Sequence, residues 1–100
     1  MSRTNVCREG RSVPDNQLVT ACYSVSAAAD PSVMARIMAI FAKRGMVPSH
    51  WHSRVSGPEN DELQIDVQMG GVSVLEAEKF AQAMRQIVCV ERVLTSSKEI

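Results

Sequence analysis

Residues 62–69 read ELQIDVQM and contain the clearest alternation of the chain. Leu63, Ile65, Val67 and Met69 alternate with charged or amide side chains at every intervening position. This two-residue period is that of a β-strand with one apolar face and one polar face. We therefore expect a strand whose apolar face covers a core and whose polar face is open to solvent.

The segments on either side of this strand predict its neighbours. The polar turn GPEN at 57–60 precedes it, and a second candidate strand, 47–55, precedes the turn, so the two strands are expected to pair as a hairpin. The two glycines at 70–71 mark the expected end of the strand. The sequence SVLE at 73–76 then matches a helix-capping box, and an apolar stripe at helical spacing predicts a helix to about Gln86.

The outer parts of the chain predict the same kinds of element. Residues 18–27 alternate as a first strand with a small polar face. Asp30 followed by Pro31 predicts the start of an apolar helix that ends at about Arg44, and residues 88–95 predict a last strand. The order β-α-β-β-α-β with right-handed crossovers implies an α+β, ferredoxin-like plait, in which two helices cover one face of a four-stranded antiparallel sheet.

The length of 100 residues allows one small domain. Residues 1–17 have no apolar period and are expected to form a flexible tail, with a docking arm for a partner as the alternative. The domain is expected to span 18–96, and residues 97–100 are expected to fray.

Charge and cysteine content exclude several classes of partner. Eleven Lys and Arg residues balance eleven Asp and Glu residues, so nothing in the overall charge favours nucleic acid or an anionic membrane. Cys7, Cys22 and Cys89 are an odd number without a CxxC pair, which fits neither a disulfide framework nor a zinc site. No apolar run has the length of a membrane span or a signal peptide. We therefore expect a cytoplasmic protein.

The expected fold supports many functions, and the residues needed for several of them are missing. RNA recognition needs aromatic side chains on the open sheet face, where Gln64, Asp66 and Gln68 stand instead. The loop at 27–31 has neither a cysteine pair for a soft metal nor an arginine for a phosphoryl group. No nucleophile triad, paired carboxylates or phosphate-binding loop appears, so we expect no catalytic residues, no cofactor and no metal.

Three polar residues form a candidate cation site. His50 and His52 lie two apart, hence on one strand face, and the hairpin is expected to place Asp66 opposite His52. Two imidazoles and a carboxylate are ligands for a borderline cation. A fourth ligand is missing, however, so we interpret these residues as a solvated polar face or part of a subunit contact.

Aromatic and sulfur side chains have simpler interpretations as packing groups. Trp51 is expected to point toward the helices together with Val47 and Val55, which favours a place in the core over a role in ligand stacking. Cys22 and Cys89 are expected on the open face of neighbouring strands. Redox pairing is the alternative there to the ordinary role of a thiol as a small hydrophobic group.

The sequence from residue 29 onward resembles the ACT domain, and within it the small regulatory subunits of acetolactate synthase. The segment DPSVM at 30–34 is similar to the turn that leads into the first helix of that family. AKRG at 42–45 resembles the helix exit, and MRQIVCVERV at 84–93 resembles the closing segment. The resemblance covers about 18–96 and is closest to the short form of the subunit.

This resemblance implies a non-catalytic chain that forms a homodimer through edge strands and binds a large catalytic subunit. Thiamine diphosphate, flavin and magnesium would belong to that large subunit. It also implies a small amino acid bound where the first strand–helix loop of one copy meets the second strand of the other. The matching residues are Ala28, Ala29, Asp30, Pro31, Ser32, Val33, Met34, Pro48, Ser49 and His50.

Two positions depart from the family pattern in this region. Ala29 stands where effector-binding members have a polar residue, and Ser32 stands where they have glycine. These departures argue against feedback inhibition by valine and favour activation or stabilisation of a catalytic partner by surface contact. A stand-alone amino-acid sensor and a purely structural dimerisation module are the alternatives.

Overall fold

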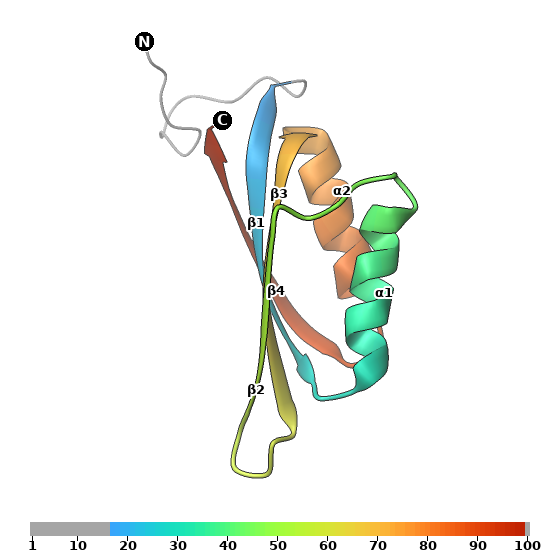
Figure 1. Cartoon of the computed structure of the whole chain (residues 1–100), viewed down its shortest axis with the longest axis vertical. Coiled ribbons are helices and arrows are strands. Elements are labelled where there is room, and N and C mark those ends of the chain that lie inside the picture. Colours follow the sequence, from blue (N-terminus) through green and yellow to red (C-terminus); the bar gives the residue numbers. More distant parts are fainter. Residues whose placement is uncertain (1–16, 100) are drawn as a thin grey trace.

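The computed structural model describes residues 17–99, which form one sheet with two helices (Figure 1). The elements in chain order are β1 (Leu18–Ala28), α1 (Pro31–Ala42), β2 (His50–Ser56), β3 (Glu62–Ser73), α2 (Val74–Arg85) and β4 (Val90–Glu99). All strand pairs are antiparallel, the sheet order is β2-β3-β1-β4, and both helices cover the same face. The predicted ferredoxin-like fold is confirmed. The expected tail lies outside the described residues except for Gln17.

The core lies between the sheet and the helices. Alternate residues of β1 and β3 point into it, as their sequence period predicts, and each helix adds one stripe. Phe41 of α1 meets Phe80 of α2 edge to face with ring centroids 5.0 Å apart. The other large, fully buried side chains are Ile37, Ile65, Met69, Met84, Val19, Val25, Val33, Val67 and Val72.

Both helices begin where the sequence predicts. The Asp30 carboxylate accepts a hydrogen bond from the Ser32 amide at 2.9 Å, and the Ser73 hydroxyl oxygen accepts one from the Glu76 amide at 3.0 Å. Helix α1 ends at Ala42, slightly before the expected end, in a turn that brings the backbone into the left-handed region three residues later.

The two glycines in β3 do not end the strand, which corrects the prediction. β3 continues through Gly70 and Gly71 to Ser73, and the pairing with β1 shifts by one residue between Val19 and Ala21. Gly71 has φ +75°. A bulge of this kind uses a glycine to turn the backbone while the strand goes on.

Strand β4 is also longer than predicted. It extends past Thr95, the expected end, and Lys98 and Glu99 pair with Thr20 and Val19. Residues 97–99 of the segment expected to fray are therefore part of the sheet. The register of these pairs places the beginning of β1 beside the end of β4.

Strand β2 forms an edge of the sheet and is poorly covered. It begins at His50, so Val47 precedes the strand and is 83% exposed, while Val55 is 53% exposed. The expectation that both valines enter the core is wrong, because the helices do not cover the outer part of this edge strand. Trp51 lies opposite buried Val67 and is half-buried against the core, as predicted.

Candidate functional site

The first half of the predicted effector site is a junction of three chain segments. The Ala28 amide donates to the Cys89 carbonyl at 2.9 Å, just before β4 begins. The Ala29 amide donates to the Asp61 carbonyl at 3.0 Å, at the end of the β2–β3 turn. Both amides are therefore used to tie the loop between β1 and α1 to its neighbours.

The N-terminus of α1 is satisfied by the chain's own groups. The Asp30 Oδ1 atom accepts from the Ser32 amide and, at 2.8 Å, from the Ser32 hydroxyl. The Val33 amide donates to the Asp30 carbonyl at 3.0 Å, and Pro31 has no amide proton. The backbone and side-chain hydrogen bonds from Ser32 lower the pKa of the Asp30 carboxyl. A carboxylate thus already occupies the place that a ligand carboxylate would take at this helix end.

The other predicted site residues do not converge on this corner within one protomer. Val33 is buried in the core and Met34 is on the outer surface of α1. Pro48, Ser49 and His50 lie at the opposite end of the sheet from the corner.

Ser49 and His50 lie next to Gln68, whereas Ala28 lies opposite Glu62. Those two positions on β3 are separated by about 20 Å along the strand. One chain therefore does not bring the two halves of the predicted effector site together.

The open face of the sheet is polar and built mainly from small side chains on β1. The Gln64 amide nitrogen donates to the Ser24 hydroxyl oxygen at 2.7 Å, and the Ser26 hydroxyl donates to the Gln64 amide oxygen at 3.0 Å. A shallow groove on this face runs between Leu94 on β4 and His50 on β2. Of the three hydrogen-bonded side chains, Ser24 lines this groove, and its hydroxyl is held by Gln64.

The histidine pair keeps its predicted register. His52 lies directly opposite Asp66, and His50 lies opposite Gln68. Within residues 17–99, however, no three His, Cys, Asp or Glu side chains are placed to hold a metal ion.

The two described cysteines do not face each other. Cys22 lies in the middle of β1, while Cys89 lies in the turn before β4, beside Ala28, and packs against the core. Cys22 and Ala28 are six residues apart on β1, which corresponds to about 20 Å along the strand. The expectation that both thiols share the open face of neighbouring strands is wrong, and both are free thiols.

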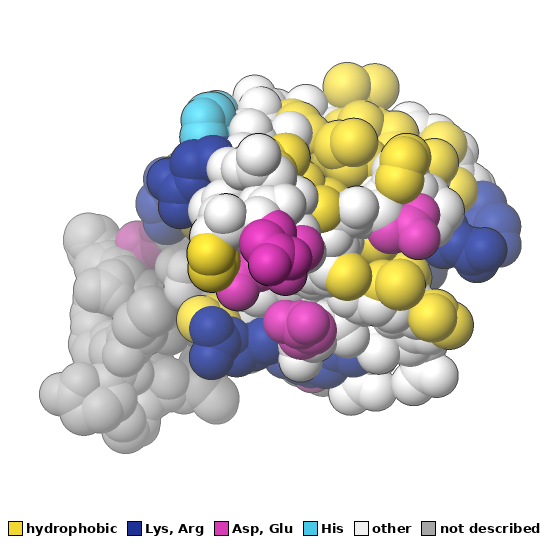
Figure 2. Space-filling model, turned by 90° about the horizontal axis from the view of Figure 1, so that it is seen from below, with side chains coloured by type: hydrophobic (Ala, Val, Ile, Leu, Met, Phe, Trp, Pro, Cys, Tyr) yellow, Lys and Arg dark blue, Asp and Glu magenta, His cyan; other side chains and the backbone are white. Residues whose placement is uncertain are grey.

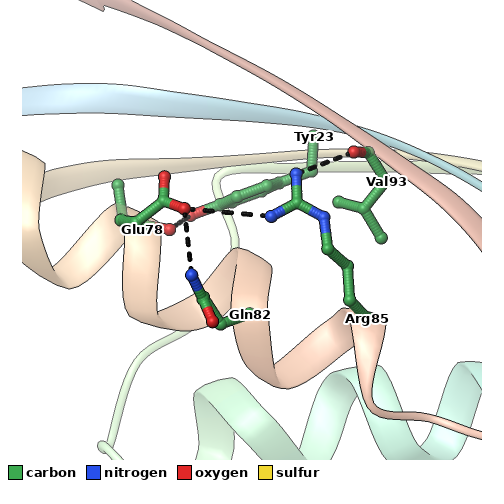
Figure 3. Close-up of polar contacts among 6 residues, drawn as sticks. Tyr23, Glu78, Gln82, Arg85 and Val93 are labelled. Carbon is green, nitrogen blue, oxygen red and sulfur yellow. Dashed lines mark hydrogen bonds and ion pairs between the residues drawn. The ribbon is translucent and has the colours of Figure 1, made fainter.

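A buried tyrosine joins α2 to β1, and an arginine beside a glutamate joins α2 to β4 (Figure 3). The Tyr23 hydroxyl donates to the Ala77 carbonyl at 2.8 Å. The Arg85 guanidinium donates to the Val93 carbonyl at 3.0 Å and lies 3.8 Å from the Glu78 carboxylate. Burial and then the nearby Glu78 carboxylate raise the pKa of Tyr23 above its usual range.

The sequence patterns discussed above do not predict that these residues come together. Two signals point to it: Glu78, Gln82 and Arg85 recur at helical spacing on one face of α2, and the only tyrosine stands on the apolar face of a strand, where its hydroxyl needs a partner. A small cavity between α2 and β4 adjoins the Tyr23 ring and Glu78. The contacts of this group join elements and show no arrangement for bond-making chemistry.

Comparisons with known proteins agree with this architecture. A family model described as an ACT-like domain matches residues 14–99. No curated protein matches the sequence. A similar solved structure is the C-terminal domain of the MgtC protein from Mycobacterium tuberculosis, with a TM-score of 0.65 at 15% identity, covering 87% of this chain and 95% of that one. At that identity the likeness concerns the fold. No helix among residues 17–99 is long and apolar enough to cross a membrane.

Proposed function

Because this chain belongs to the ACT-like domain family, we propose that it is a regulatory module that acts by binding a partner protein and performs no bond-making chemistry of its own. The observation that carries this proposal is the closed corner between β1 and α1. The polar groups of this corner are hydrogen-bonded within the chain. We therefore infer that the module acts mainly through contact with a partner protein and not by binding an anionic effector at the corner.

The chemistry of the corner supports regulation by protein contact. A free amino acid would have to displace the Asp30 carboxylate from the Ser32 amide, or bind beside it with two carboxylates close together. Both arrangements cost free energy, because like charges repel and an unpaired amide loses its hydrogen bond. A partner protein needs no such displacement, since it binds through exposed surface.

The narrower proposal names the partner as the large subunit of a thiamine-dependent acetolactate synthase in branched-chain amino-acid biosynthesis. It rests on the sequence resemblance at 30–34, 42–45 and 84–93. A homodimer joined through edge strands would present the module in two copies, and the cofactors would remain with the large subunit. The free thiols of Cys22 and Cys89 suit a reducing cytoplasm. Regulation would follow from tighter binding to the active conformer of the enzyme.

Co-purification tests the proposal. The full chain, carrying an affinity tag, is mixed with a thiamine-dependent synthase from the same source, and association and synthase activity are measured. We expect a stable complex and a higher activity than that of the synthase alone. Absence of both effects would refute the narrower proposal, and turnover of a substrate by the purified chain alone would refute the regulatory role.

Calorimetry separates this function from that of an amino-acid sensor. We expect no heat when valine, leucine or isoleucine is added to the chain. The variant Asp30→Ala is the matched comparison, because it frees the Ser32 amide without altering the core. Saturable heat with the unchanged chain would favour the sensor, with the exposed Asp30 carboxylate as the group that receives the ligand ammonium.

A further inference from the structure

A small cavity between α2 and β4 opens at the surface beside Glu78. Its volume is about 120 Å³, and its apolar walls come from Val19, Ala21, Tyr23, Val74 and Ala77. Sites for small organic ligands usually measure about 300–1,000 Å³, whereas an engineered cavity of about 150 Å³ holds one benzene molecule. The cavity between α2 and β4 therefore has the size and the apolar walls that suit one aliphatic side chain.

The part of the chain that precedes β1 joins the domain beside this cavity. Val19 lines the cavity, and Leu18 lies opposite Ser73, whose hydroxyl caps α2. Residues 1–16 therefore enter the domain at the end of the sheet where α2 begins. Six residues span up to about 20 Å, so a side chain six positions before Val19 reaches the cavity even when the chain turns back in between.

The sequence just before β1 provides both a turn signal and an aliphatic side chain. Val13 is the only Val, Ile, Leu or Met residue between positions 8 and 17. Pro14 and Asp15 follow it, and a proline followed by an aspartate is typical of the centre of a β-turn. We propose that the chain reverses at 14–16 and that Val13 occupies the cavity between α2 and β4. There the valine side chain leaves water and contacts apolar walls.

A charged group on α2 sets the direction in which the segment runs. Glu78 lines the cavity one helical turn after Val74, about 6 Å further along the helix axis. Arg11 precedes Val13 by two residues, about 6–7 Å in an extended chain. A segment with Val13 beside Val74 therefore brings Arg11 to Glu78. Both contacts that Figure 3 draws to Glu78 use its Oε2 atom, so its Oε1 atom is available to a second cation.

The acidic groups at the far end of the molecule are out of reach of Arg11. Figure 2 views the molecule from the end where α1 begins and shows acidic side chains there. Asp30 caps α1 at that end, and the length of β1, about 33 Å, separates it from the start of β1. On α2 itself, the Glu76 carboxylate is paired with the Arg44 guanidinium at 3.2 Å. Glu78 is therefore the acidic residue of α2 that is placed to receive Arg11.

This contact goes beyond the proposed regulatory role and does not depend on it. The family model that matches the chain begins at residue 14, so Val13 and Arg11 lie outside the part of the chain that defines the family. The alternative role of the tail is that of a docking arm for a partner. A segment held on its own domain is not available for that role.

Cysteine cross-linking tests the position of Val13. In a full chain whose native cysteines are replaced by serine, Val13→Cys is combined with Thr95→Cys, because Thr95 lines the cavity. Val13→Cys with Leu94→Cys is the matched control, since Leu94 is the neighbouring residue of β4 and lines the groove on the open face instead. We expect mild oxidation to close the first pair within one chain at least about tenfold faster than the second, since a disulfide needs Cα atoms within about 7 Å. Equal rates, or disulfides formed mainly between two copies, would overturn the proposal.

Limited proteolysis tests the contact with Glu78 in the chain with its native cysteines. Trypsin cleaves after arginine, so cleavage after Arg11 reports on the docked segment, and cleavage after Arg3 of the same chain is the reference. We expect Glu78→Gln to raise the ratio of the two rates by about two- to fivefold, the effect of losing one exposed ion pair. Glu76→Gln is the matched control and should leave the ratio unchanged, because Glu76 pairs with Arg44. A ratio that Glu78→Gln leaves unchanged, or that both variants raise equally, would refute the docked arrangement.

Discussion

Tyr23 shows how one residue couples the sheet to a helix. Its ring belongs to the apolar face of β1, and its hydroxyl reaches the Ala77 carbonyl of α2 at 2.8 Å. Because the carbonyl accepts the phenolic proton, this hydrogen bond requires the neutral form. Burial and the Glu78 carboxylate act in the same direction and raise the pKa of Tyr23.

The raised pKa predicts an alkaline loss of stability. A folded-state pKa above the unfolded value means that Tyr23 contributes stability that is fully present below about pH 10 and falls as the pH rises above it. Tyr23 is the only tyrosine, so the tyrosinate absorption band reports on it alone. We expect this band to appear together with unfolding, as followed by circular dichroism.

The matched variant for this experiment is Tyr23→Phe. It should lower the free energy of unfolding at neutral pH by about 1 kcal/mol, the net value of one hydrogen bond, and remove the part of the alkaline instability that comes from this residue. Ionisation of Tyr23 in a fully folded chain near pH 10 would contradict the account.

At the scale of the elements, the bulge in β3 depends on one of two adjacent glycines. Gly71 has φ +75°, whereas Gly70 has no such strain, and a Cβ atom at Gly70 would lie 3.7 Å from the Thr20 hydroxyl oxygen, an ordinary contact. We expect Gly71→Ala to lower the free energy of unfolding by about 1 kcal/mol and Gly70→Ala to change it little. Urea denaturation measures both values, and equal effects would contradict this reading of the bulge.

The local signals in the sequence were sufficient for the fold. The alternation at 63–69, the cap at Ser73 and the Asp30-Pro31 start are each determined by groups close in sequence, and the structure confirms all three. The helix periodicity and the order of the elements along the chain then allow only a small number of topologies for four strands and two helices.

The differences arise where distant parts of the chain decide the outcome. Residues 97–99 have little apolar character and form a strand because their backbone pairs with that of β1. Val55 has the residue type of a core position but lies on an edge strand that the helices do not reach. Cys89 takes φ +82° in a turn that no local pattern predicts. Register places Ala28 and His50 at opposite ends of the sheet, so an effector site formed by both residues needs two copies and stays a prediction.

At the scale of the whole molecule, the sheet has two dissimilar edges. Strand β4 is held by Arg85, whose guanidinium bonds to the Val93 carbonyl, while β2 pairs with β3 and has mostly exposed side chains. Backbone amides should therefore be better protected from hydrogen exchange in β4 than in β2.

Hydrogen exchange tests the difference. We expect the slowest exchange in β1 and β3, intermediate exchange in β4 and the fastest exchange in β2. Arg85→Gln should speed exchange in β4 and leave β2 unchanged. If β2 proves as protected as β3 in dilute samples, an additional strand covers that edge and the edge-strand homodimer gains support.

The pairing of Val19 with Glu99 has a consequence for how the domain can be joined to other chains. The start of β1 and the end of β4 lie side by side at one end of the sheet. Short linkers are therefore enough to insert the domain into a surface loop of a larger protein without distorting its core. The same closeness makes the fold suitable for circular permutation, with new ends cut in the polar turn at 57–60.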